Sequence, residues 1–323
     1  MKLIQINRHG GPEVLEWADA PEPVVGSGQA LIRQTAIGLN FIDTYHRSGL
    51  YPLAFPAGLG MEAAGIVEAV GAGVGALAPG DRVAYCSPPP GAYAEKRALA
   101  AERLVKLPAG VSERTAAAAM LKGLTAWYLL RRSYPARRGD SVLAYAAAGG
   151  VGLILGQWAR SLGVRAIGVA STAEKAALAR ANGYAEVILA DAPGFVARVR
   201  ELTGGEGVAA VYDSVGKLTF TQSLDCLRKH GVMVSYGNAS GPVEAFTPLE
   251  LSRRGSLYVT RPSLFDFIAA RADLEEGAGE LFALIASGAV KVHIGQTYPL
   301  AETARAHRDL EGRRTTGSTV LLP

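Results

Sequence analysis

The stretch VLAYAAAGGVG, residues 142–152, decides the fold. An apolar strand runs directly into a glycine-rich turn, and an apolar segment of helical length follows at 153–162. Against the pattern G-x-G-x-x-G, Ala147, Gly149 and Gly152 occupy the three marked positions, with alanine in place of the first glycine. Such a turn lets the backbone approach a pyrophosphate, and the amides that begin the helix bind the anion. The stretch therefore predicts a dinucleotide-binding strand–turn–helix unit.

The chain that follows supplies the context that this motif needs, because a glycine run by itself also occurs as a tight turn without a ligand. Strand-like runs alternate with helix-length segments that often end in glycine. Parallel strands joined by crossover helices form a doubly wound α/β sheet. The predicted strands are 141–145, 164–170, 185–189, 208–213, 232–236 and 257–260.

The regions before and after this segment show a different pattern of secondary-structure signals. Residues 1 to about 100 are rich in glycine and proline, with short β-type runs such as 29–35 and 64–70, which predicts a small barrel-like β domain. The alanine-rich segment 113–130 predicts one or two helices. The tail contains a helical stretch at 273–286, a short run at 290–294 and a closing β run at 318–322, and the pattern alone does not assign it to a domain.

Composition and charge narrow the function classes. The 323 residues suggest two domains, and 49% apolar with 19% charged residues exclude large-scale disorder. Lys plus Arg (33) exceed Asp plus Glu (29) by only four, so neither nucleic acid nor an anionic membrane is expected as the main partner. Two distant cysteines, Cys86 and Cys226, indicate a reducing compartment, and we expect the cytoplasm. No signal-peptide core and no run of about 18 apolar residues is present, so no membrane association is expected.

The end of the second predicted strand distinguishes the two nicotinamide cofactors. An NAD site places Asp or Glu there, on the ribose 2′-hydroxyl. This chain has no carboxylate at 170 or 171; Ser171, Thr172 and Lys175 follow instead. Hydroxyls and an ammonium suit a 2′-phosphate of about −1.5 to −2 charges, which predicts NADP(H). Ser171 and Glu174 also fit a helix capping box, and the two interpretations can coexist.

Several long motifs extend the cofactor turn into a family resemblance. The sequence resembles the zinc-free quinone oxidoreductases of the medium-chain dehydrogenase/reductase superfamily, which include the zeta-crystallins, and is most similar to the bacterial NADPH:quinone reductase type. The motifs are GGPEVL (10–15), NFIDTYHRSGLY (40–51), GMEAAG (60–65), GDRV (80–83), LKGLT (121–125), the glycine turn, DSVG (213–216) and RPSL (261–264).

The resemblance implies an architecture and an activity. A GroES-like β-barrel catalytic domain would comprise residues 1–123 and 264–323, and a Rossmann NADP(H)-binding domain residues 124–263. The activity would be zinc-independent, NADPH-dependent reduction of a small-molecule quinone. The family is typically dimeric through edge strands of the nucleotide domain, which implies a homodimer.

The resemblance also indicates whether the chain could bind a catalytic zinc. A catalytic zinc needs three Cys, His or carboxylate ligands. Asn40 stands where the zinc-dependent branch has its cysteine, and Met61 replaces its histidine. The four-cysteine structural lobe is missing as well. We therefore expect no metal, with a site built on His46 and Glu62 as the remaining alternative.

The site residues implied by the resemblance fall on its motifs. Asn40, Asp43, Tyr45 and Thr125 would lie at the nicotinamide end of the cofactor. The pyrophosphate would lie on Gly149, Gly150 and Val151, and the 2′-phosphate on Ser171 and Lys175. Further residues lining the cofactor would be Ser214, Asn238, Arg261, Pro262 and Ser263.

Tyr45 and Tyr51 are the candidate catalytic residues. An aromatic face can stack on a quinone, and a phenol can hydrogen-bond a carbonyl oxygen that gains charge. Either side chain could instead pack only as part of the pocket wall. The alternative functions are an NADPH-dependent enoyl or alkenal reductase, and a non-catalytic NADPH-binding protein of crystallin-like or RNA-binding type.

Overall fold

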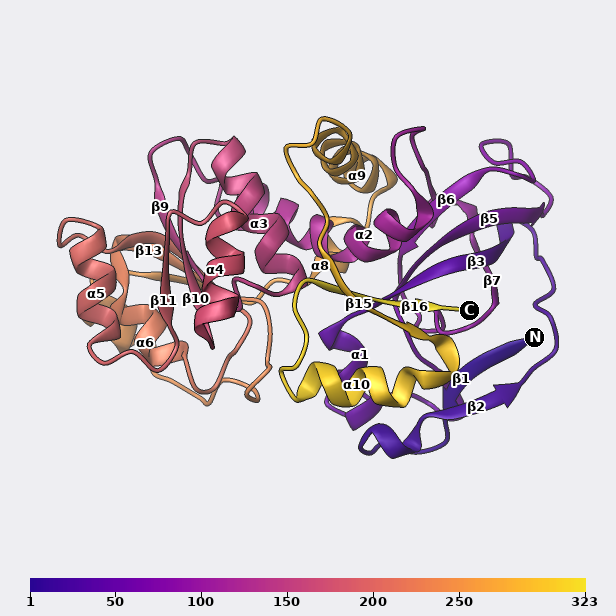
Figure 1. Ribbon diagram of the computed structural model, residues 1–323, viewed down its shortest axis with the longest axis horizontal. Helices are drawn as coiled ribbons and strands as arrows, with labels where there is room; N and C mark the ends of the chain where they lie inside the picture. Colours follow the sequence, from indigo (N-terminus) through magenta and orange to yellow (C-terminus); the bar gives the residue numbers. More distant parts are fainter. The chain divides into compact units, whose positions relative to one another are not determined.

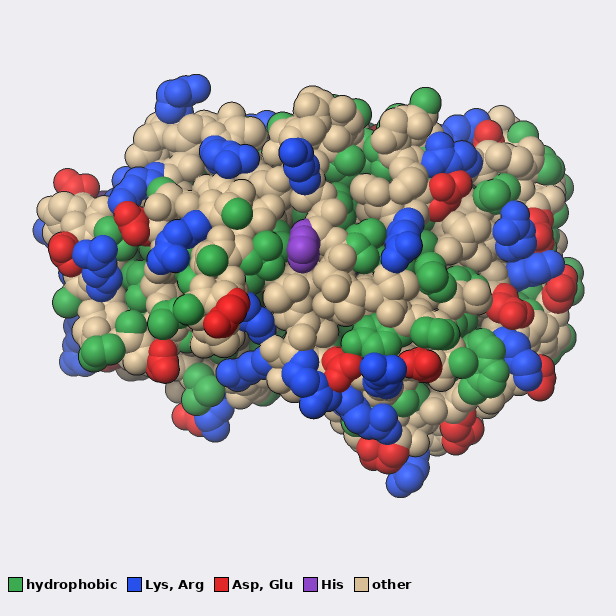
Figure 2. Space-filling view, viewed as in Figure 1, with side chains coloured by type: hydrophobic (Ala, Val, Ile, Leu, Met, Phe, Trp, Pro, Cys, Tyr) green, Lys and Arg blue, Asp and Glu red, His purple; other side chains and the backbone are tan.

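The computed structural model describes residues 1–323 and divides into two compact units (Figure 1). Unit 1 comprises Met1–Leu124, Ile268–Ala286 and Val292–Pro323, and unit 2 comprises Thr125–Phe267 and Ser287–Lys291. None of the helices combines the length and the apolar composition that crossing a lipid bilayer requires. On the face drawn in Figure 2, basic side chains are interspersed with acidic ones.

Unit 2 is built on one six-stranded parallel sheet of strand order β11-β10-β9-β12-β13-β14. The order reverses between β10 and β12, on either side of β9, as in the Rossmann topology. The predicted doubly wound sheet is confirmed. Its strands are β9 (Ser141–Ala144), β10 (Arg165–Ala170), β11 (Glu186–Leu189), β12 (Val208–Asp213), β13 (Leu227–Ser235) and β14 (Tyr258–Thr260).

The helices of unit 2 follow the strands in alternation (Figure 1). Phe195 and Val199 of one helix and Leu224 of the next join Leu143 and Ile167 of the sheet in a single buried cluster. Burial of these apolar side chains holds the layers together. The helices are α3 (Gly150–Ser161), α4 (Ala173–Ala181), α5 (Phe195–Leu202), α6 (Phe220–Asp225), α7 (Leu249–Arg253) and α8 (Leu264–Phe267); a π-helical turn (Leu129–Ser133) precedes β9.

Unit 1 is a β domain with two sheets. A seven-stranded sheet runs β15-β16-β3-β5-β6-β8 with β7 also paired to β3, and a smaller sheet runs β2-β1-β4. The strands are β1 (Lys2–Ile6), β2 (Glu16–Asp19), β3 (Gln29–Leu39), β4 (Ala57–Gly58), β5 (Glu62–Val70), β6 (Arg82–Cys86), β7 (Lys96–Ala100), β8 (Val105–Lys106), β15 (Ile294–Pro299) and β16 (Ser318–Leu322).

The helices of unit 1 connect and cover these sheets. They are α1 (Phe41–Ser48), α9 (Arg271–Ala286), α10 (Thr303–Glu311) and the short 3-10 turns Pro12–Val14, Ala101–Arg103 and Leu300–Glu302. Helix α2 (Glu113–Tyr128) begins in unit 1 and ends in unit 2. The core of unit 1 includes Ile4, Ile32, Val67, Tyr85 and Leu321, all at most 2% exposed.

The tail joins unit 1 through β16, which pairs antiparallel with β3. The short run at 290–294 does not form a strand of its own: β15 begins only at Ile294, where parallel pairing with β16 starts. Residues 287–291 belong to unit 2 instead. There the Gln157 side chain on α3 donates to the Lys291 carbonyl (3.1 Å) and accepts from the Lys291 amide (2.9 Å). Two backbone bonds to a buried glutamine thus replace the ladder bonds of a strand.

Candidate functional site

The carboxyl ends of the parallel strands in unit 2 carry the residues predicted to hold the cofactor. The glycine turn follows β9, Ser171 follows β10 and Ser214 follows β12. Asn238 comes after β13 and Arg261 directly after β14. Because all these strands are parallel, their carboxyl ends lie at one edge of the sheet. Ligands of open α/β sheets bind at this edge, beside the point where strand order reverses.

The glycine turn leaves the start of α3 bare. Gly149 is its N-cap and supplies no side-chain cap, so the first amides, 150–152, have no intrahelical acceptor. A Cβ on Gly152 would lie 2.4 Å from the Ala146 carbonyl oxygen, so only glycine permits this close approach. The left-handed backbone falls on Ala146 (φ 51°), which explains why alanine is tolerated at Ala147, the first marked position. The exposed amides can bind an anion.

The segment after β10 corrects one detail of the sequence interpretation. Thr172, one residue later than Ser171, is the N-cap of α4, and its hydroxyl accepts the Lys175 backbone amide at 3.3 Å. The pKa of Glu174 is lowered by its own backbone amide and by a hydrogen bond from Thr172. The capping box expected from Ser171 and Glu174 is therefore wrong. Ser171 is exposed at the end of β10, next to the helix N-terminus.

The loop that carries Ser214 is fixed by a buried carboxylate. Asp213, which has no solvent exposure, accepts the backbone amides of residues 215 and 216 at 2.7 and 3.1 Å. Its other oxygen accepts the hydroxyls of Thr219 (2.7 Å) and Ser223 (2.9 Å). Four donors on one carboxylate make the loop geometry rigid. Ser214 is thereby held at the carboxyl edge of the sheet.

The loops after β13 and β14 meet through Asn238 and Arg261. In the amide orientation that its neighbours require, Asn238 accepts a hydrogen bond from Arg261 (3.3 Å) and donates to the Gly237 carbonyl (3.0 Å). Arg261 also donates to the Pro262 carbonyl at 3.0 Å. Pro262 is buried, whereas Ser263 is exposed. The structure therefore brings together two of the predicted residues from segments far apart in sequence.

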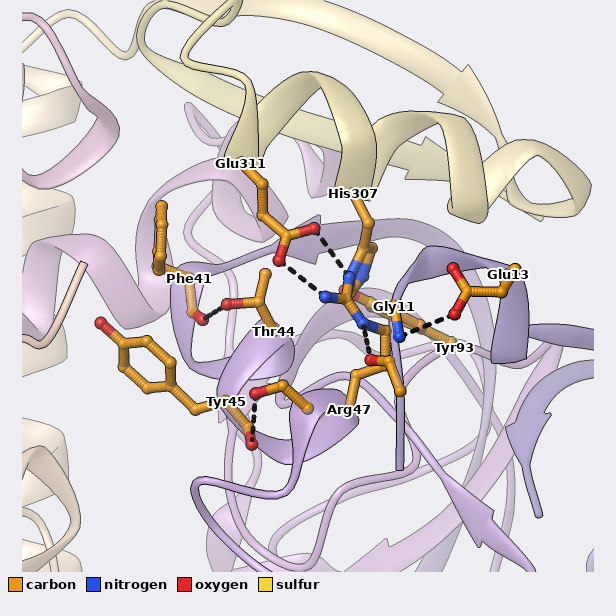
Figure 3. Close-up of polar contacts among 11 residues, drawn as sticks. Gly11, Glu13, Phe41, Thr44, Tyr45, Arg47, Tyr93, His307 and Glu311 are labelled. Atoms are coloured by element: carbon orange, nitrogen blue, oxygen red, sulfur yellow. Dashed lines mark hydrogen bonds and ion pairs between the residues drawn. The ribbon is translucent and has the colours of Figure 1, made fainter. Parts of the chain in front are cut away.

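In unit 1, helix α1 organises the other predicted residues. Asn40 is its N-cap, and the Asp43 carboxylate accepts the Asn40 backbone amide at 2.9 Å. The rings of Tyr45 and Tyr51 meet edge to face at 5.4 Å, and the Tyr51 amide donates to the Tyr45 carbonyl (3.1 Å). Figure 3 shows Phe41 and Tyr45 on the side of α1 away from Arg47. The helix thus presents an aromatic face separate from its charged one.

A buried ion pair supports the N-cap of α1. Lys122 on α2 contacts Glu62 on β5 at 2.9 Å, with side chains 6% and 0% exposed. The same Glu62 oxygen accepts the Asn40 side-chain amide (2.8 Å), and the other accepts the Leu121 backbone amide (2.6 Å). A Cβ on Gly38 would lie 2.2 Å from this carboxylate, so glycine makes room for it. The bond to Glu62 fixes the orientation of the Asn40 side-chain amide, whose nitrogen donates inward.

The groups considered for a metal have other partners. Glu62 is engaged by Lys122, Asn40 and Leu121. His46 lies against the Tyr51 ring (5.8 Å), and burial lowers its pKa to about 4. Among residues 1–323, no three His, Cys, Asp or Glu side chains are grouped so that they could hold a metal ion. The arrangement at Glu62 is that of a lysine-neutralised carboxylate.

The predicted residues therefore fall into two groups. Asn40, Asp43, Tyr45 and Tyr51 lie on and beside α1 in unit 1. Unit 2 contains Thr125, which is buried on α2, and the residues at the carboxyl edge of its sheet. The sequence analysis assigned no role to Lys122 and considered Glu62 only as an alternative metal ligand. A lysine within the apolar segment AAAAMLKGL was the available signal, because a buried lysine needs a partner.

Comparisons with known proteins agree with this geometry. Residues 26–109 match the alcohol dehydrogenase GroES-like domain, and residues 150–283 match the domain described as zinc-binding dehydrogenase. Quinone oxidoreductase of Pseudomonas aeruginosa is 53% identical, with 100% of this chain and 99% of that protein covered. A 2-haloacrylate reductase of a Burkholderia species is 45% identical over 98% of each chain.

A solved structure is similar over the whole length. The crystal structure of Escherichia coli quinone oxidoreductase complexed with NADPH superposes with a TM-score of 0.98, at 48% identity and 100% coverage of both chains. The expected pairing of a GroES-like β domain with a Rossmann domain is confirmed. The chain belongs to the quinone oxidoreductase family of the medium-chain dehydrogenase/reductase superfamily.

Proposed function

We propose that this protein is an NADPH:quinone oxidoreductase. One observation carries the proposal: the bare N-terminus of α3 lies at the same edge of the sheet as Ser171 and Lys175, which follow a strand end that has no carboxylate at 170 or 171. Full-length similarity to the quinone oxidoreductases of P. aeruginosa and E. coli supports it. When bound, the reduced nicotinamide supplies the reducing electrons.

The residues of unit 2 fit such a dinucleotide. The pyrophosphate would lie on Gly149, Gly150 and Val151. The amides of Gly150 and Val151 would bind it, because they begin a helix and have no acceptor within it, whereas the amide of the N-cap Gly149 donates to the Ala146 carbonyl (2.8 Å). Ser171 and Lys175 would bind the 2′-phosphate, since one offers a hydroxyl and the other an ammonium. Thr125, Ser214, Asn238, Arg261, Pro262 and Ser263 would line the rest of the cofactor.

In unit 1, Asn40, Asp43 and Tyr45 would contact the nicotinamide end. A buried oxygen of Asp43, Oδ1, has no hydrogen-bond partner within the chain, as expected of an atom that accepts from a bound ligand. Tyr45 and Tyr51 would orient the quinone, one ring stacking while a phenol donates to a carbonyl oxygen. Tyr45→Phe and Tyr51→Phe test this role. Quinone turnover unchanged in both variants would exclude it.

A second candidate is reduction of an activated carbon–carbon double bond. The 45% identity to a 2-haloacrylate reductase favours it over the remaining alternatives. The two reactions are separated by one assay, in which purified protein and NADPH are tested in parallel with 1,4-benzoquinone, 9,10-phenanthrenequinone, 2-chloroacrylate and a short 2-alkenal. Oxidation of NADPH only with the quinones supports the proposal, and oxidation only with the alkenes supports the second candidate. NADPH binding without any turnover would indicate a non-catalytic protein.

We also propose a role for each domain and an oligomeric state. Residues 1–123 and 264–323 would form the catalytic domain, except that 264–267 and 287–291 lie in unit 2. Residues 124–263 would form the NADP(H)-binding domain. Strand β14 is an edge of the unit 2 sheet and exposes 61% of Tyr258, a surface that suits pairing with the same strand of a second copy. Light scattering on the eluted protein should give twice the monomer mass. Both cysteines are buried and free, which suits a cytoplasmic enzyme.

A further inference from the structure

A buried chain of hydrogen bonds leads away from Asp43 on α1, and Figure 3 shows its outer members Tyr93, His307 and Arg47. The Tyr93 hydroxyl, from the segment between β6 and β7, lies 2.7 Å from Asp43 Oδ2. His307 Nε2, on α10, lies 3.1 Å from the same hydroxyl, and His307 Nδ1 lies 3.0 Å from Arg47 Nη1. All four residues are at most 2% exposed. Four groups from three segments of unit 1 thus form one continuous network.

The direction of every bond in this network follows from its outer member. A guanidinium can only donate, so His307 Nδ1 must accept from Arg47. Burial and the charge of Arg47 lower the pKa of His307 to about 3, so the ring is neutral and holds its one proton on Nε2. Nε2 then donates to the Tyr93 oxygen, and the Tyr93 proton points to Asp43. The network therefore orients the Tyr93 hydroxyl as a hydrogen-bond donor to the Asp43 carboxylate.

The outer end is anchored near the surface. Glu311, the last residue of α10, accepts two hydrogen bonds from Arg47, at 2.6 and 2.9 Å. Arg47 also donates to the Gly10 carbonyl at 3.0 Å. The Arg47 side chain is 3% exposed and that of Glu311 is 35% exposed. The charge of Glu311, near the surface of unit 1, is therefore linked to Asp43 through a series of buried hydrogen bonds.

The inner end is the head of α1. Asp43 Oδ2 also accepts the Asn40 amide, and Oδ1 has no partner within the chain. Burial raises the pKa of Asp43 to about 7, opposed by the bonds from Tyr93 and Asn40 and by the charge of Lys122, while Glu62 acts in the same direction as burial. The Asp43 carboxyl group therefore changes charge near neutral pH, and the hydrogen-bond donors around it set the pH at which this happens.

We propose that Tyr93, His307 and Arg47 are positioning residues that hold Asp43 as an ionised acceptor, and that the charge of Asp43 controls how tightly the nicotinamide cofactor binds. The inference rests on the proposed function, in which Asp43 contacts the nicotinamide end of NADPH. Ionised Asp43 keeps the Asn40 amide in place through Oδ2 and accepts from a cofactor hydroxyl through Oδ1. Protonation removes a charge-assisted acceptor from both bonds.

Two substitutions with opposite expected effects test the network. Tyr93→Phe removes the donor to Asp43, so the pKa of Asp43 rises. As the pH falls, NADPH binding is then lost earlier than in the wild type, and the midpoint of this loss moves up by about one to two pH units. Glu311→Gln removes a negative charge beyond Arg47, so the pKa of Asp43 falls. The midpoint of NADPH binding against pH moves down by roughly a few tenths of a unit. The Kd for NADPH is measured by nicotinamide fluorescence from pH 5.5 to 8.5, together with kcat/KM for a quinone.

The control is Tyr298→Phe. It removes another tyrosine-to-aspartate bond of 2.7 Å in unit 1, to Asp309, which lies outside the network. The 2′-phosphate of NADPH titrates in the same way with every protein compared, so its effect cancels from the difference in midpoint between each variant and the wild type. The control should leave the binding profile unchanged.

The outcomes are distinct. Shifts of opposite sign in Tyr93→Phe and Glu311→Gln support the network. A common loss of affinity without a change of midpoint, or a control that shifts like Tyr93→Phe, overturns it. If Tyr93→Phe does not fold, the Glu311→Gln midpoint decides alone: a downward shift supports the network, and no shift overturns it. Wild-type protein that binds NADPH but turns over no quinone would contradict the proposed function while these binding profiles still decide the network.

Discussion

Lys122→Met should destabilise unit 1 far more than the loss of an ordinary salt bridge. The Lys122 ammonium lies 2.9 Å from Glu62, and both side chains are almost fully buried, at 6% and 0% exposure. Removing one partner of a buried pair leaves an uncompensated charge and costs about 3–5 kcal/mol. Methionine keeps most of the lysine side-chain volume, so the change isolates the charge. With a urea m-value of about 2–3 kcal/mol/M, the unfolding midpoint should fall by roughly 1–2.5 M.

Urea titration followed by hydrogen-exchange mass spectrometry measures this change, because peptides from β3 and β5 report on unit 1 separately from unit 2. The matched control is Lys2→Met. Lys2 contacts Asp19 at 2.8 Å, but the side chains are 39% and 81% exposed. Such a surface pair contributes at most about 1 kcal/mol, so the control midpoint should hardly move.

The reasoning is refuted if Lys122→Met and Lys2→Met lower the unit 1 midpoint equally. A second comparison tests the cause. Adding Glu62→Gln to Lys122→Met removes the uncompensated charge while keeping a hydrogen-bonding side chain, so the double variant should be more stable than Lys122→Met alone. A double variant that is less stable would show that lost packing, and not the buried charge, dominates.

The remaining predictions concern the cofactor and pH. Lys175→Ala should raise the KM for NADPH roughly tenfold and leave that for NADH unchanged, as steady-state kinetics with both cofactors will show; equal effects would exclude a 2′-phosphate contact. Gly152→Ala places a Cβ 2.4 Å from the Ala146 carbonyl and should weaken NADPH binding at least tenfold, roughly, by fluorescence titration, whereas Gly279→Ala on α9, with open space around it, should not. Since burial lowers the pKa of His46 from 6.5 to about 4, its neutral state contributes stability that is present above pH 6.5 and is lost as the pH falls toward 4, by up to about 3 kcal/mol. Urea unfolding of His46→Phe should lose less stability between pH 7 and 5 than the wild type, and an identical loss would refute this account.

Unit 2 was largely predictable because its signals are local. Apolar strand runs, helix-length segments and turn glycines recur in the order that a doubly wound sheet requires, and the observed strands lie close to the predicted ones. The glycine turn is a local motif as well, since the close approach at Gly152 involves residues only a few positions away. The candidate residues at the carboxyl edge followed from strand direction, which the alternation of strands and helices implies.

Other features had no local signal. The start of β15 at Ile294 depends on pairing with β16 and could not be located from the run 290–294 alone. The cap of α4 was assigned one residue early, because Ser171 and Thr172 are both capping residue types and only the backbone conformation chose Thr172.

The sequence by itself determined the nucleotide-binding architecture and the absence of a carboxylate at the end of β10, because periodicity and turn chemistry act over a few residues. Only the tertiary structure decided which charges meet: Glu62 with Lys122, 60 residues apart, and Arg47 with Glu311, 264 residues apart. A buried charge requires a partner, but any distant residue of opposite charge satisfies that requirement in sequence. The choice among them is made by the sheets and helices that bring the two segments together.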